Sequence, residues 1–60
     1  MTPEGYYAAV RAMGLTPTNV PNVFVGRDRT MQSVPSPYDM TPEQREETIA
    51  FIRRQREENS

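Results

Sequence analysis

The chain has 60 residues, a formal net charge of −1, no cysteine and no histidine. Disulfides and the thiolate or imidazole ligands of metal sites are therefore excluded, as are the commonest general base and the strongest nucleophile of enzymes. No segment carries a catalytic or phosphate-binding motif. We therefore expect one non-catalytic domain over residues 1–60, with no cofactor, no metal and no small-molecule substrate.

Charge and hydropathy limit the partners further. All seven basic residues are arginines, whose planar guanidinium groups suit contacts with carboxylates and phosphates. A net charge near zero gives little counterion release, so nucleic acid is not the expected partner. No stretch approaches the roughly 18 apolar residues of a membrane span, and no signal-peptide core is present. We expect a cytoplasmic protein with no membrane contact.

The first predicted element is a helix over about residues 3–13. Thr2 is a typical N-cap, and Pro3 occupies the first helical position, where its missing N–H costs no hydrogen bond. Apolar side chains then recur at helical spacing. Gly14 is the residue type expected just after a helix, because it adopts positive φ without strain.

A proline-containing connector and a β-hairpin are predicted next. Residues 16–21 have no helical period, and each proline there favours extended geometry in the residue before it. Strands over about residues 22–25 and 30–34 follow from β-branched and aromatic content, with turn residues between them. Gly26 is either the first residue of a type II′ turn or part of a bulge.

An extended, proline-containing segment over residues 34–40 leads to a second helix over about residues 42–56. Thr41 is its N-cap, and Gln44 three residues later completes a capping box. The order is therefore helix, strand, strand, helix. Because a hairpin alone is unstable, the sequence predicts an α+β fold in which both helices pack on one face of the hairpin.

The core of such a fold is small. A domain of this size buries only about 60% of the surface that its unfolded chain exposes, so its stability is marginal. A partner chain is one way to add burial. The predicted core consists of Tyr6, Ala9, Val10, Met13, Leu15, Val20, two or three of Val23, Phe24 and Val25, Met31, Val34, Ile49 and Ile52.

Two phenylalanines indicate where a protein partner would bind. Strand alternation sends Val23 and Val25 to one face of the hairpin and Phe24 to the other, and two helices cover only one face. Phe51 lies about 100° from the centre of the apolar stripe of the second helix. We therefore predict a binding surface that contains Phe24 and Phe51. The uncovered face and the open edges of the hairpin are where another chain would add. That chain is a second copy, in a homodimer, or another protein.

Five arginines provide the alternative. They are contacts for an anion or a nucleic acid, for example with the hairpin in a groove, or they are solvated charges that complement helix dipoles and nearby acids. Interleaved acidic residues favour the second interpretation. The alternative function is a small nucleic-acid-binding or regulatory protein acting through its hairpin and its second helix. The residues concerned are Arg27, Arg29, Arg53, Arg54 and Arg56.

The residues at the starts of the two predicted helices resemble segments of other proteins. Residues 2–11, Thr-Pro-Glu-x-Tyr-Tyr-Ala-Ala-x-Arg, resemble the start of short uncharacterised bacterial proteins, some of them phage- or prophage-associated. Residues 40–49, Met-Thr-Pro-Glu-Gln-Arg-Glu-Glu-Thr-Ile, resemble a later segment of the same group. The resemblance implies a phage-derived protein. It implies no activity and no site residue.

Overall fold

The computed structural model describes residues 1–58, and its first element is bounded by the residues that the sequence indicates. Helix α1 (Pro3–Ala12) begins after Thr2, whose hydroxyl accepts a hydrogen bond from the Gly5 N–H at 3.0 Å. Beyond the helix, Gly14 has a φ of 86°. This left-handed conformation is the one that favours glycine just after a helix.

Helix α2 (Pro42–Glu58) begins with a reciprocal capping box. The Gln44 N–H donates to the Thr41 hydroxyl at 3.2 Å, and the Gln44 side-chain oxygen accepts from the Thr41 N–H at 2.9 Å. The helix continues past its predicted end near residue 56. Within the described residues, neither helix is both long and apolar enough to cross a membrane.

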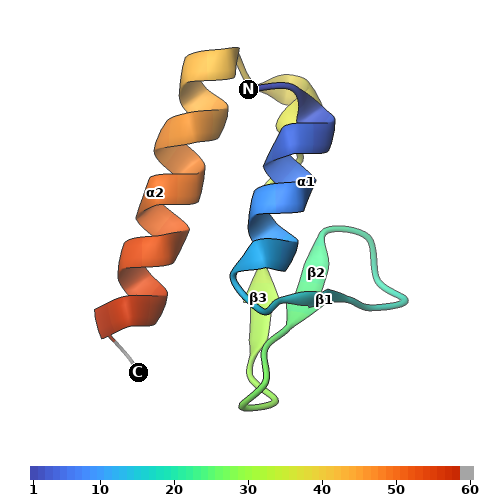
Figure 1. Ribbon diagram of the computed structural model, residues 1–60. Helices are drawn as coiled ribbons and strands as arrows, with labels where there is room; N and C mark the ends of the chain where they lie inside the picture. Colours follow the sequence, from blue (N-terminus) through green and yellow to red (C-terminus); the bar gives the residue numbers. More distant parts are fainter. Residues whose placement is uncertain (59–60) are drawn as a thin grey trace.

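The sheet has three antiparallel strands in the order β1-β2-β3, one strand more than predicted (Figure 1). The predicted hairpin is formed by β2 (Val23–Val25) and β3 (Met31–Ser33). The additional strand, β1 (Thr16–Pro17), pairs with the other side of β2. It lies within the predicted connector. A proline is compatible with this position, because β1 is an edge strand.

The hairpin turn has its positive φ at Arg29 and not at Gly26. The Gly26 N–H donates to the Thr30 carbonyl at 2.9 Å, and the Arg29 N–H donates to the Gly26 carbonyl at 3.0 Å. Arg29 has a φ of 67°. This pattern is a three-residue connection in which a β-turn is followed by one left-handed residue. It excludes the type II′ alternative, which requires positive φ at the first central residue.

The segment after β3 is less extended than predicted. Pro37–Asp39 form one turn of 3₁₀ helix, η1. The Arg45 side chain reaches this turn from α2, with Nε donating to the Pro37 carbonyl at 2.8 Å. Its Nη1 donates to the Met1 carbonyl at 2.9 Å. One arginine thus joins α2, η1 and the start of the chain.

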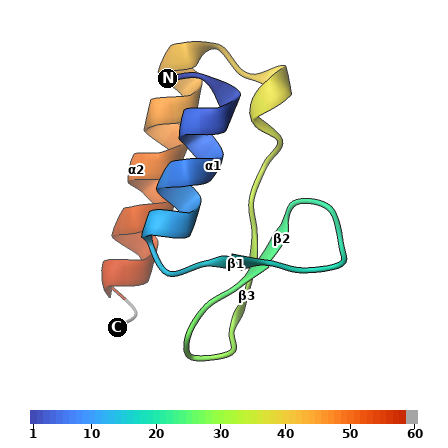
Figure 2. The same cartoon turned by 45° about the vertical axis from the view of Figure 1, so that its right-hand side comes forward.

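A single core joins both helices to one face of the sheet. In Figures 1 and 2, α1 lies beside α2, the sheet lies at the C-terminal end of α1, and the chain after β3 returns along α1 to η1. Each helix contributes buried side chains, so the α+β class is confirmed. The buried core residues are Tyr6, Val10, Leu15, Phe24, Val34, Ile49 and Ile52.

Phe24 faces this core, contrary to the prediction that it lies on the uncovered face of the hairpin. Its side chain is 4% exposed, and its ring stacks on that of Tyr7 with the centroids 6.3 Å apart. Because adjacent strand residues alternate, Val23 and Val25 are directed to the opposite face. The aromatic side chains of α1 cover the larger ring and leave the two valines outside the core.

Two further residues do not belong to the core in which the sequence places them. Met31 is opposite Val25 in the sheet, so it shares the outer face, and it is 61% exposed. Val20 lies in the loop between β1 and β2 and is 55% exposed. Among the described strand residues, the outer face of the sheet therefore carries one large exposed apolar side chain, that of Met31.

Candidate functional site

A groove of about 940 Å³ lies between the hairpin and the last turns of α2. The hairpin, α2 and the end of α1 all contribute to its lining. Three guanidinium groups line it, from Arg27, Arg53 and Arg56, and we call it the arginine groove. Two carboxylates also line it, from Asp28 and Glu57.

The arginine groove contains three of the five arginines that the sequence singles out. Arg53 and Arg56 are three positions apart, so they lie on one face of α2. Arg27 joins them from the hairpin turn. Arg54 and Arg29 are exposed but do not line the groove. The structure therefore divides the predicted set into a convergent trio and two isolated side chains.

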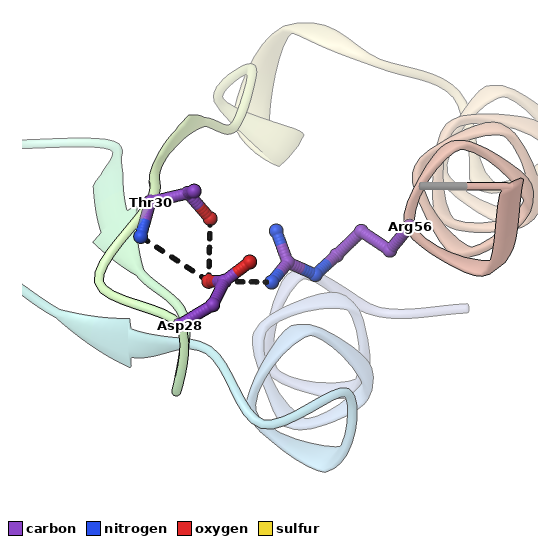
Figure 3. A network of polar contacts seen from close by, with 3 residues as sticks. All are labelled: Asp28, Thr30 and Arg56. Carbon is purple, nitrogen blue, oxygen red and sulfur yellow. Dashed lines mark hydrogen bonds and ion pairs between the residues drawn. The ribbon is translucent and has the colours of Figure 1, made fainter. Parts of the chain in front are cut away.

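Arg56 is held in position by the hairpin turn (Figure 3). Its Nη2 lies 3.7 Å from the Asp28 Oδ1. The same carboxylate oxygen accepts hydrogen bonds from the Thr30 hydroxyl at 2.6 Å and the Thr30 N–H at 3.2 Å. The Thr30 hydroxyl bond is the largest cause of a lowered pKa for the Asp28 carboxyl, and Arg56 contributes a smaller attraction. Asp28 therefore stays ionised and already has partners.

Gly26 provides space for this arrangement. It is buried, and a Cβ added to it would overlap the Arg56 guanidinium and lie 2.8 Å from the Asp28 Oδ1. Its φ is not in the left-handed region. A side chain at this position would therefore have to displace the ends of the Arg56 and Asp28 side chains.

Arg27 lies against the end of α1. A Cβ added to Gly14 would be 3.3 Å from the Arg27 Nε. The guanidinium therefore sits near the carboxyl end of the helix, where the helix dipole favours positive charge. Within residues 1–58, the side chains of Arg27 and Arg53 form no hydrogen bond and no ion pair. Both cations are available to a ligand.

The arginine groove runs along the open edge of β3. In the sheet, β3 has a neighbouring strand, β2, on one side only. Met31 and Gln32 both line the groove, although successive strand residues direct their side chains to opposite faces. The hollow therefore touches β3 at two successive residues of the strand that is paired on one side only.

The backbone of β3 leaves hydrogen-bonding groups on this edge. The Thr30 carbonyl and the Val34 N–H bond to the β2 side of the hairpin. Because such pairs recur at every second residue, the Met31 and Ser33 groups between them point away from β2. The Ser33 carbonyl accepts from the side-chain amide of Gln32 at 3.0 Å. The edge is thus open at Met31 and capped by a side chain at Ser33.

Phe51 lies outside the arginine groove. It is 59% exposed, on the outer side of α2. Its neighbours one turn away on the helix are all polar, so the ring stands alone among polar side chains: Glu47, Thr48, Arg54 and Gln55. Because Phe24 is buried, the two phenylalanines do not form one exposed surface.

Sequence reasoning expects a partner chain at the open edges of the hairpin but does not single out Met31, Gln32 and Ser33 as parts of a site. The available signal is weak: a strand without proline follows a turn rich in charge. Which strand edge stays open depends on β1. Because β1 pairs on the other side of β2, the outer edge of β3 is left unpaired. That pairing joins residues distant in sequence and has no local signature.

Comparison of the chain with models of protein families, with curated proteins and with solved structures gives no match. The resemblance of the two helix starts to short bacterial proteins stays a prediction. No group of three or more acidic side chains within residues 1–58 is placed to hold a metal ion. The arginine groove and the β3 edge are therefore the features from which a function is inferred.

Proposed function

We propose that the chain is a non-catalytic protein-interaction domain that binds an extended segment of a partner along the open edge of β3. The observation that carries this proposal is the position of that edge, which forms one wall of the arginine groove. An extended peptide added to a sheet edge gains main-chain hydrogen bonds, and its alternate side chains enter neighbouring pockets. A groove of about 940 Å³ has room for several residues of such a segment.

The exposure of Met31 supports the same mode of binding. Its side chain is 61% exposed on the outer face of the sheet. A strand added beside β3 places its own side chains next to Met31 on that face, and cross-strand pairs of this kind stabilise sheets. Binding therefore adds apolar burial to a domain whose own core is small.

Selection of short peptides from a random display library, on the immobilised full chain, tests this function. Affinities of the selected peptides are measured by titration calorimetry. Met31→Pro removes the outward N–H without removing a bond to β2, since proline is tolerated at such edge positions. Met31→Ala is the matched control, because it shortens the side chain and keeps the N–H. We expect the proline variant to lose binding and the alanine variant to be weakened less, because alanine loses only the apolar contact of the side chain.

Thermal melts establish that both variants are folded, and amide exchange in the wild type gives an independent measurement. Exchange of the Met31 and Ser33 amides should slow when a selected peptide is added, because they become hydrogen-bonded. Peptides that bind equally to Met31→Pro and leave these two amides unprotected would overturn strand addition. A library that yields nothing tighter than about 1 mM would overturn the proposal as a whole.

Nucleic-acid binding is the second candidate function, favoured by the convergence of Arg27, Arg53 and Arg56 in one groove. Asp28 and Glu57 line the same groove and oppose a phosphate backbone. With a net charge of −1, we expect no binding of duplex or single-stranded oligonucleotides at about 150 mM salt. Salt-sensitive binding that is lost in Arg27→Ala/Arg53→Ala would make this the preferred function.

A further inference from the structure

We infer that the partner segment that enters the arginine groove carries acidic side chains. This inference rests on the proposed function, since it names the chemistry of the segment that adds to β3. The side chains of Arg27 and Arg53 have no polar partner within residues 1–58. Each guanidinium presents five N–H donors in a planar fork, which matches the two oxygens of a carboxylate.

The charges in the groove favour an anionic occupant. Three arginines and two acidic residues, Asp28 and Glu57, line the groove. The Asp28 oxygen that faces Arg56 already accepts two hydrogen bonds from Thr30. A basic segment would meet uncompensated like charge in the groove, whereas an acidic segment compensates it. The net positive charge of the groove thus disfavours basic peptides and favours acidic ones.

The spacing of the arginines fits an extended chain. Arg53 and Arg56 are three residues apart on α2, which is a rise of about 4.5 Å along the helix. Side chains on one side of an extended segment repeat every two residues, about 6.6 Å. Arginine side chains are long enough to span this difference. In Figures 1 and 2 the last turn of α2 is at about the level of β3.

Strand addition requires that the hydrogen bond between the Gln32 side chain and the Ser33 carbonyl be replaced. The Gln32 side-chain amide donates to the Ser33 carbonyl at 3.0 Å, which is the bond that the N–H of an added strand would make. An incoming strand replaces this amide at the carbonyl. The released amide lies in the groove lining, where it can donate to a carboxylate of the bound segment.

The test uses three labelled peptides of alternating sequence, Val-Glu, Val-Gln and Val-Lys repeats of equal length, titrated against the full chain by fluorescence anisotropy. We expect the glutamate peptide to bind about tenfold more tightly than the glutamine peptide. The glutamine complex lacks at least one arginine–carboxylate pair, and the loss of one such pair accounts for a difference of this size. The lysine peptide should not bind. Raising the salt concentration should weaken the glutamate complex most.

Arginine variants locate the effect. Arg27→Ala and Arg53→Ala should each weaken the glutamate complex about tenfold. Arg29→Ala and Arg54→Ala are matched controls, because each removes the same charge from the same element outside the groove, and they should leave the affinity unchanged. Equal losses in all four variants would show general charge attraction and overturn the assignment to the groove.

The outcomes separate this inference from the function on which it rests. Equal affinity for the glutamate and glutamine peptides, lost in Met31→Pro, would overturn the acidic preference and leave strand addition standing. Failure of all peptides, including those selected by display, would overturn both. Tighter binding of a single-stranded oligonucleotide than of the glutamate peptide, at the same salt concentration, would also overturn the inference.

Discussion

The Tyr6 hydroxyl donates a hydrogen bond of 2.8 Å to the Pro35 carbonyl, 29 residues further along the chain. Tyr6 belongs to α1 and its side chain is fully buried, while Pro35 begins the segment that returns from β3 to η1. The bond gives a buried phenol the partner that it would otherwise lack. Burial, with a smaller contribution from Tyr7, raises the pKa of Tyr6 from its ordinary value of 10.0 to about 12.

Stability should therefore fall at alkaline pH. Below about pH 10 the Tyr6 phenol is protonated in both folded and unfolded chains, so its contribution is complete. As the pH rises through the folded-state pKa of about 12, the unfolded chain has already lost the proton that the folded chain keeps. The unfolded state binds fewer protons, so the free energy of unfolding decreases, by about 2–3 kcal/mol in total.

Thermal melts at a series of alkaline pH values, on wild type and Tyr6→Phe, measure this effect. The phenylalanine variant should be less stable near neutral pH by about 1 kcal/mol, because the Pro35 carbonyl loses its donor. Its stability should also depend less steeply on pH above about pH 10. Parallel pH profiles for the two proteins would show that a group other than Tyr6 governs alkaline unfolding.

Gly14→Ala should destabilise the domain by about 1 kcal/mol or slightly more. The φ of 86° at this position is strained for a residue with a Cβ. The added methyl would also lie 3.3 Å from the Arg27 Nε. On a domain of this size the melting temperature should fall by several degrees. Gly14→Asn is the control, since asparagine tolerates this conformation better; equal melting of wild type and the alanine variant would contradict the strain.

Arg29→Gly should stabilise the domain. Arg29 has a φ of 67° at the turn position where hairpins of this kind usually have glycine. Glycine removes a strain of about 1–2 kcal/mol. Its greater unfolded-state entropy costs about 0.5–1 kcal/mol, so a net stabilisation of between about 0 and 1.5 kcal/mol is expected. Arg27→Gly is the matched control, because its φ is not positive. A melting temperature that falls equally in both variants would contradict this explanation.

The sequence predicts those parts of the fold that depend on neighbouring residues. The capping box of Thr41 and Gln44 and the glycine after α1 are local, so their residue types suffice. Strand β1 is not local, because two residues form it only by pairing with β2. The placement of Phe24 fails for a related reason: alternation decides which residues share a face, but not which face the helices cover.

The candidate site divides in the same way. Helical spacing alone puts Arg53 and Arg56 on one face of α2 and turns Arg54 away. Arg27 joins Arg53 and Arg56 because the hairpin turn lies close to α2. The 3.7 Å contact between Arg56 and Asp28 shows this proximity. A side chain at Gly26 would displace the Arg56 guanidinium from its present position in this contact. A contact between distant segments has no periodicity from which it can be predicted.

The two phenylalanines that the sequence assigns to one surface should now behave differently. Phe24 is 4% exposed, and truncating a buried phenylalanine to alanine costs about 3–5 kcal/mol. A small domain has about that much stability in total, so Phe24→Ala should be largely unfolded. Phe51 is 59% exposed, and Phe51→Ala should melt within about 0.5 kcal/mol of wild type. Circular dichroism melts of both variants check this difference.

The folded Phe51→Ala variant also tests whether that ring supports self-association. Its helix neighbours Glu47, Arg54 and Gln55 are polar, so an interface centred on Phe51 would bury charged groups beside a single ring, and their desolvation opposes association. We therefore expect wild type and Phe51→Ala to have the same mass at every concentration in sedimentation equilibrium. A wild-type dimer that becomes a monomer in Phe51→Ala would contradict this and place Phe51 in the interface. A dimer that persists in Phe51→Ala but is lost in Met31→Pro would instead locate self-association at the β3 edge.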